Sequence, residues 1–139
     1  MRSNKDKIAQ ICAMGWIYIS DADIEDHPGS TFIYVSGEWE AIPFSKAEFK
    51  EEIPGSGRII KQELSATITG LNQAQEASLR KMVAGHGLIR LDYTNGDSKV
   101  IGSEQVPIKI SLEINGSPST YSLSVKRSSP EPSKFFKSF

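Results

Sequence analysis

Apolar and polar residues alternate over most of residues 88–126, which is the pattern of β-strands that bury one side. The apolar positions are Ile89, Leu91, Tyr93, Ile108, Ile110, Leu112, Ile114, Tyr121, Leu123 and Val125. Asn-Gly pairs at 95–96 and 115–116 interrupt the alternation, and this dipeptide favours a type I′ hairpin turn. Because successive side chains of a strand point to opposite faces, we predict an antiparallel sheet with one buried face.

The first half of the chain predicts further strands. Residues 31–36 and the second half of 8–19 are rich in β-branched and aromatic side chains, as strands are. Residues 58–70 form a long predicted strand, with Gln62 as a polar exception on its apolar side. We expect residues 39–44 to return as the partner of 31–36, at the edge of a sheet because Pro43 cannot donate a backbone hydrogen bond.

A helix is predicted after the long strand. Asn72 suits the N-cap, and Gln75 stands three residues later, as a capping box requires. A single face, defined by spacings of three and four, holds Ala74, Gln75, Ser78, Leu79, Met82 and Val83. Gly85 and Gly87 end the helix. The predicted fold class is therefore mainly β with one helix: an antiparallel β-sandwich or barrel flanked by a single α-helix.

Composition sets limits on this fold and its setting. A length of 139 residues is typical of one domain, so we expect a single domain over 1–139. The net charge of −1 gives no global basic field for nucleic acid. No stretch approaches 18 consecutive apolar residues, so we expect no membrane span. Residues 8–19 follow a basic start, but they lack a cleavage site, and we interpret them as mature protein.

The sequence offers little for catalysis. Neither His27 nor His86 has a His or Cys neighbour at metal-ligand spacing. The acidic stretch 21–29 lacks the Gly and the final Glu of an EF-hand calcium loop. Cys12 lies in an apolar stretch without a base beside it, so we expect a buried structural thiol. We therefore predict no catalytic residue, no cofactor and no metal site, and we expect that the chain is not an enzyme.

Charge separates the ends of the chain from two polar segments. The predicted arms, residues 1–7 and 128–139, are basic, whereas the stretches 21–29 and 38–52 are acidic and, with 45–57, are predicted to be loops. If copies of the chain assemble, we expect the basic arms to dock on acidic loops of an adjacent copy, with phenylalanines as apolar anchors. Deletion of 128–139 is then expected to leave a folded monomer that does not assemble. The alternative is that both ends are disordered tails. The candidate subunit-interface residues are Lys5, Lys7, Asp21, Asp23, Glu51, Glu52, Phe135, Phe136 and Phe139.

The order of these elements resembles the tail-tube fold of bacteriophages, which the tubes of contractile injection systems share. The resemblance is carried by QELSATITGLNQAQEASLRKMVAGHG (62–87), LDYTNGDSKVIGS (91–103) and ISLEINGSPSTYSLSVKR (110–127). It implies a virion structural protein, assembled in the host cytoplasm, whose copies form rings, usually hexamers, that stack into a tube. The implied partners are further copies, other tail proteins, and DNA that passes through a lumen.

Other functions remain open at this point. A neighbouring tail component, such as a terminator, a tube initiator or a neck protein, fits the same pattern. A small β-domain that binds a ligand or carbohydrate is the alternative, with a pocket expected between Trp16, Trp39 and a tyrosine. For a lumen, the faces rich in Ser and Thr are the best candidates, namely Ser65, Thr67, Thr69, Thr120, Ser122 and Ser124.

Overall fold

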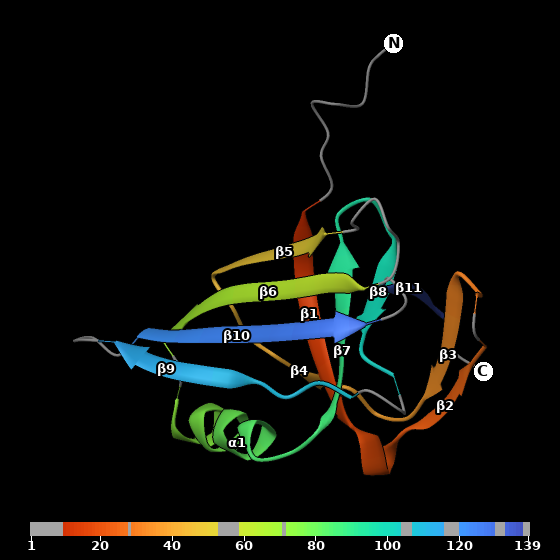
Figure 1. Ribbon diagram of the computed structural model, residues 1–139. Helices are drawn as coiled ribbons and strands as arrows, with labels where there is room; N and C mark the ends of the chain where they lie inside the picture. Colours follow the sequence, from red (N-terminus) through yellow and green to blue (C-terminus); the bar gives the residue numbers. More distant parts are fainter. Residues whose placement is uncertain are drawn as a thin grey trace.

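In the residues that the structure describes, the fold consists of two sheets and one α-helix (Figure 1). A computed structural model describes residues 10–27, 29–52, 59–70, 72–103, 107–115, 120–129 and 133–137. In chain order the elements are β1 (Ile11–Tyr18), the 3₁₀ helix η2 (Ile19–Asp21), β2 (Asp23–Asp26), β3 (Phe32–Ser36), β4 (Glu40–Ala41), β5 (Lys46–Glu52), β6 (Ile60–Thr69), α1 (Gln73–Val83), β7 (Gly87–Tyr93), β8 (Ser98–Ile101), β9 (Ser111–Asn115), β10 (Thr120–Ser129) and β11 (Lys134–Lys137).

The strands form a seven-stranded and a four-stranded sheet, which we call sheet A and sheet B. Sheet A has the order β2-β3-β11-β8-β7-β1-β4, and sheet B has the order β5-β6-β10-β9. The described pairings are antiparallel except that of β11 with β3, which is parallel. In Figure 1 the strands of sheet B cross β1 and β7 at a steep angle. The predicted fold class, a β-sandwich or barrel with one helix, is confirmed.

Two apolar cores lie on the two faces of sheet A. The larger core fills the space between the sheets and contains the buried Trp16, Leu64, Ile89 and Leu123. The smaller core lies on the other face, where sheet A curls over itself and brings β3 to β1 and β7. Its buried members are Ile17, Ile33, Val35, Leu88 and Val100. The residues of 88–126 are thus divided between two sheets, and one of these sheets is buried on both faces.

Helix α1 begins with the predicted capping box. The Asn72 side chain accepts from the Gln75 backbone N–H at 2.8 Å, and the Gln75 side chain accepts from the Asn72 N–H at 3.1 Å. Of the predicted apolar face, only Leu79 and Met82 are buried, whereas Ala74, Gln75 and Ser78 are exposed. The helix therefore packs through its C-terminal half. Among the described residues, no helix has the length and apolar character that a membrane crossing needs.

The first Asn-Gly pair forms the predicted hairpin between β7 and β8, but the predicted turn type is wrong. Gly96 has a φ of 93°, and among the described residues no non-glycine residue, Asn95 included, has a positive φ. The Gly96 N–H donates to the Tyr93 carbonyl at 3.0 Å, and the Tyr93 N–H donates to the Asp97 carbonyl at 2.8 Å. These bonds describe a type I turn with a glycine bulge, which needs only one positive φ. Gly116 of the second pair, with residues 117–119 after it, lies outside the described residues.

Three predictions for the first half of the chain are wrong. The predicted loop 21–29 contains β2, which pairs with β3, and the predicted loop 45–57 contains β5, which pairs with β6. Residues 39–44 do not pair with β3; their strand β4 pairs with β1 instead. In the first two cases pairing with the next strand along the chain overrides a polar composition, and in the third a strand distant in the sequence takes the place of the neighbouring one. Residues 53–58 lie outside the described part of the chain.

Candidate functional site

The edges of sheet B are the first feature that bears on assembly. In the part of the chain that the structure describes, β5 pairs only with β6 and β9 only with β10. Each strand of the sheet is antiparallel to the next, so β5 and β9 run in opposite directions. If two copies are related by a rotation that keeps strand direction, β9 of one copy and β5 of the next are antiparallel. Sheet B can therefore continue from copy to copy.

The solvent face of sheet B is rich in hydroxyl groups and carries no net charge. Ser65 and Thr67 on β6 lie beside Ser124 and Ser122 on β10. The charged side chains that alternate onto the same face are Lys46, Glu48, Lys50, Glu52, Lys61, Glu63, Glu113 and Lys126. The lysines and glutamates of this list balance one another. The face therefore has no basic stripe that would hold phosphate groups.

One row of paired residues crosses this face with unlike charges at its two ends. The row runs from Lys46 on β5 through Thr67 and Ser122 to Glu113 on β9. Lys46 and Glu113 are both exposed. When the row continues into the next copy without a shift, the Glu113 carboxylate of one copy faces the Lys46 ammonium of the next.

The adjacent row, on the core side of sheet B, places a large side chain at one edge and a hollow at the other. It runs from Ala47 through Ala66 and Leu123 to Leu112. Leu112 is only partly buried. Beside Ala47 lies a hollow of about 380 Å³, lined also by Ile11, Phe44, Phe49 and Tyr93. An apolar side chain from a neighbouring β9 would fill this hollow.

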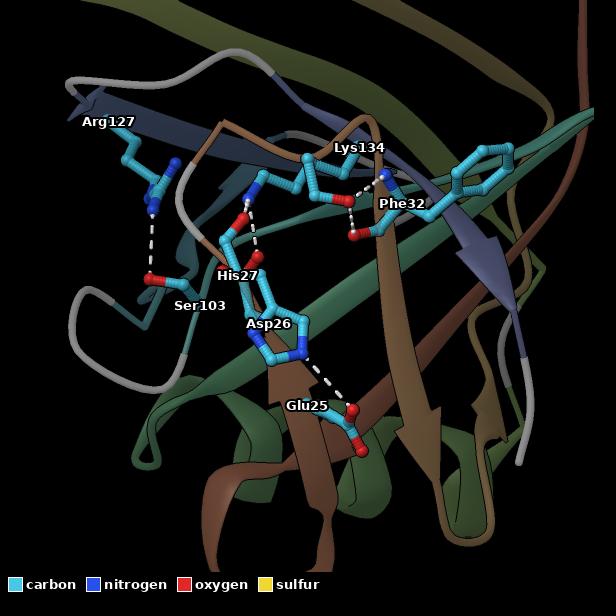
Figure 2. Close-up of polar contacts among 8 residues, drawn as sticks. Glu25, Asp26, His27, Phe32, Ser103, Arg127 and Lys134 are labelled. Carbon is cyan, nitrogen blue, oxygen red and sulfur yellow. Dashed lines mark hydrogen bonds and ion pairs between the residues drawn. The ribbon is translucent and has the colours of Figure 1, made fainter.

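The predicted C-terminal arm is largely part of the fold, so that prediction is wrong for residues 128, 129 and 134–137. Ser128 and Ser129 belong to β10, and β11 lies between β3 and β8. The Lys134 ammonium, almost fully buried, forms an ion pair with Asp26 and donates to the His27 carbonyl at 2.9 Å (Figure 2). A buried charge with a paired carboxylate and a carbonyl acceptor fixes the position of β11.

A second polar network joins residues 133–137, which we call the C-terminal segment, to sheet B. The Glu51 carboxylate accepts from the Ser133 N–H at 2.6 Å and from the Gln62 amide at 2.7 Å. The Arg127 guanidinium donates to the Gln62 carbonyl oxygen at 2.6 Å. Its other amino group lies 3.5 Å from the Ser103 hydroxyl (Figure 2). Burial lowers the pKa of Arg127, which the charges of Asp26 and Glu51 partly offset. The polar exception Gln62 thus bridges two charged groups.

These contacts change the assignment of the predicted interface residues. The charge complementarity between acidic segments and the basic C-terminal segment exists within one chain, where Asp26 pairs with Lys134. Glu51 also binds this segment, through the backbone N–H of the uncharged Ser133. Asp21, Asp23 and Glu52 are exposed, and no hydrogen bond or ion pair joins any of them to the described residues 133–137. Lys5, Lys7 and Phe139 lie outside the described residues.

The two described phenylalanines of the C-terminal segment lie on opposite faces of β11. Phe136 packs edge-on against Trp39 with ring centroids 5.7 Å apart, and the Arg90 guanidinium lies 5.0 Å from its centroid. Phe135 is 36% exposed beside Phe32, with ring centroids 6.1 Å apart. Phe136 is therefore a core contact, and Phe135 is the one that is available to a partner.

The pocket predicted for a ligand is absent from its predicted place. Trp16 is fully buried in the larger core, whereas Trp39 packs over Gly15 against the smaller core. Trp16 pairs with Glu40, the residue after Trp39. Because successive side chains face opposite ways, Trp16 and Trp39 lie on different sides of sheet A. The exposed thiol of Cys12 also contradicts the expectation of a buried one.

A larger apolar pocket of about 700 Å³ lies instead between α1 and the β1–β4 edge, and we call it the helix pocket. Its lining includes Cys12, Glu40 and the apolar residues Met14, Ile42, Phe44, Ala74, Leu79 and Met82. No group of three or more His, Cys, Asp or Glu side chains among the described residues is placed to hold a metal ion. Comparison of the chain with protein-family models, curated proteins and solved structures found no match.

Proposed function

We propose that this chain is a structural subunit of a bacteriophage tail, in the tube or an adjoining neck or terminator component, and that its copies form rings. The observation that carries the proposal is the pair of edge strands in sheet B, β5 and β9. β5 and β9 run in opposite directions, so each copy offers the next an edge of the correct polarity. Backbone pairing across copies turns two unsatisfied edges into one continuous sheet.

The side chains at the two edges support this arrangement. The continued rows bring Glu113 of one copy opposite Lys46 of the next, and Leu112 into the hollow beside Ala47. The apolar contact supplies burial, and the charge pair fixes register more than it adds affinity. Each copy pairs through β9 with one neighbour and through β5 with the other. The contact is therefore head-to-tail and closes into a ring when the rotation permits.

The face that such a ring presents to its lumen suits the passage of DNA. The Ser and Thr side chains of β6 and β10 occupy its centre, and lysines are balanced by glutamates. A lumen with a continuous basic stripe would bind phosphates and retain the DNA. A neutral, hydroxyl-rich wall is therefore the expected lining for a channel that must release its cargo.

Charge reversal at the two edges tests the proposal. Light scattering of the wild-type protein should give a mass that is a multiple of the 15.3 kDa chain. Lys46→Glu or Glu113→Lys alone should each weaken association, by roughly two- to fivefold for an exposed pair. The double variant Lys46→Glu/Glu113→Lys should restore it. Lys61→Glu is the matched control, because Lys61 is exposed on the same face but lies on an inner strand.

A monomer at every concentration would contradict ring assembly. Rings that are equally stable in Lys46→Glu, Glu113→Lys and the control would contradict the proposed edges. Leu112→Asp gives a second measurement, because it places a charge beside the apolar side chains of the hollow and should dissociate the rings without unfolding the chain, as far-UV circular dichroism would show.

A further inference from the structure

An exposed aromatic pair on sheet A lies outside the contacts proposed for the edges of sheet B. Among the described residues, the large apolar side chains with the greatest exposure are Ile59, Phe32 and Phe135. Phe32 and Phe135 are paired neighbours on β3 and β11, and the Lys99 ammonium lies 5.4 Å from the Phe135 ring centroid. We call Phe32, Phe135 and Lys99 the aromatic patch. Two half-exposed phenyl rings beside a cation are typical of an anchor for a partner.

The helix pocket lies at the opposite end of the same sheet. A row of paired residues runs from Phe32 through Phe135, Lys99 and Leu91 to Met14, which lines the pocket. The patch on β11 is thus three strands from β1, a distance of about 14 Å at the usual strand spacing. The patch cannot enter the pocket of its own chain, so any contact between them joins two copies.

We propose that the aromatic patch of one copy inserts into the helix pocket of a second copy. This inference rests on the proposed self-assembly, and it names a second contact besides the edges of sheet B. A cavity of about 150 Å³ accepts one benzene molecule, so the pocket of about 700 Å³ has room for both phenyl rings. The exposed positions Ala74 and Ser78 of α1 carry small side chains, which keep the entrance wide.

Charge complementarity favours this occupant. Glu40 is the single charged residue in the pocket lining, and Lys99 is the cation beside Phe135. When the rings enter the pocket, the ammonium of Lys99 approaches the carboxylate of Glu40 at the rim. The contact joins unlike surfaces, so it extends head to tail. Because the strands of the two sheets cross at a steep angle (Figure 1), this contact and edge pairing in sheet B extend in different directions. The contact between the aromatic patch and the helix pocket is therefore a candidate for stacking one ring on another.

The only cysteine of the chain makes the inference directly testable, because Cys12 is exposed in the pocket lining. The experiment mixes wild-type chain with the F135C/C12S variant, so that each chain carries one thiol on one of the two surfaces. Mild oxidation of the mixture should yield disulfide-linked dimers on non-reducing gels, well above the yield from either chain alone. F32C/C12S serves as a second probe in case F135C/C12S does not fold. K61C/C12S is the control, because Lys61 is exposed on the outer face of sheet B.

The outcomes separate this inference from the ring proposal. Cross-linking in the mixture that exceeds both single chains and the K61C/C12S control supports insertion of the patch into the pocket. An equal yield from all samples overturns it, whether or not rings form. Repeating the mixture on the Leu112→Asp background tests independence: cross-linked dimers should persist while rings are lost. If rings form and the disulfide does not, this inference is overturned, while the proposed edge pairing in sheet B is retained.

A charge exchange provides a second readout. Lys99→Glu and Glu40→Lys should each lower the cross-linked yield, and the double variant should recover it. If the pocket binds a small apolar molecule instead of a second copy, neither Lys99→Glu nor Glu40→Lys should alter the cross-linked yield. This result also overturns the inference.

Discussion

The C-terminal strand and the edges of sheet B differ in where their polar groups find partners. β11 lies between two strands, with Lys134 paired to Asp26 and Ser133 bonded to Glu51 inside the same chain. β5 and β9 have a partner strand on one side only in the described part of the chain. Both regions mix acidic, basic and apolar residues in the sequence. Charge complementarity alone therefore does not distinguish a contact within a chain from a contact between chains.

Removal of the C-terminal strand gives the largest expected effect. Truncation after Ser129 removes β11, the packing of Phe136 and the Lys134–Asp26 pair. We expect a loss of at least about 4 kcal/mol in the free energy of unfolding, the scale of one deleted core phenylalanine. Urea denaturation measures this loss. Phe135→Ser is the control, since it changes an exposed position of the same strand and should cost far less.

This expectation reverses the one drawn from the sequence. If the truncated chain is as stable as the intact protein, β11 is a dispensable arm, and the contrast between the two regions disappears.

The buried ammonium should account for a part of that loss. Lys134→Met keeps the aliphatic stem but leaves Asp26, whose side chain is 20% exposed, without its partner. We expect unfolding to become easier by about 2–4 kcal/mol, at or just below the range for breaking a buried ion pair. Thermal and urea unfolding measure the change, with Lys61→Met as an exposed control expected within about 0.5 kcal/mol of wild type.

A companion variant sharpens this test. Asp26→Leu combined with Lys134→Met removes both charges, so it should be more stable than Lys134→Met alone. A double variant that is no more stable than the single one would show that Lys134 acts through other contacts.

The smallest expected effect concerns Tyr93, which lines the hollow beside β5. Burial, and then the nearby charge of Glu51, raises the pKa of its hydroxyl above the ordinary value of 10.0. The folded chain thus favours the neutral phenol, so this contribution to stability is complete below pH 10 and is lost as pH rises through the folded pKa. Urea midpoints at pH 9 and pH 11 should therefore differ less in Tyr93→Phe than in wild type. Equal differences in the two proteins would contradict the assignment.

Much of the fold follows from residues that alternate with a clear period. The alternation of Ile60, Leu64, Ala66 and Ile68 predicts β6, and the pair Asn72 and Gln75 predicts the start of α1. β5 carried the same signal, because Ala47 and Phe49 alternate with charged residues, but its acidic composition favoured a loop. A period of two in a charged segment is thus stronger evidence than the composition of that segment.

Other features have no local signal. β11 pairs with β3, which lies about a hundred positions earlier in the sequence, and the parallel pairing needs no turn between them. The partner of Lys134 and the role of Gln62 depend on this pairing. The candidate interface likewise became visible only when the register placed Lys46 and Glu113, and Ala47 and Leu112, at opposite ends of shared rows.

The most direct test of the central claim is amide hydrogen exchange, measured at low and high protein concentration. Pairing between copies predicts that β5 and β9 gain protection as assemblies form, while β11 is equally protected in monomer and assembly. If protection in β5 and β9 is the same at both concentrations although the mass has increased, the copies associate through other surfaces, and the account is contradicted.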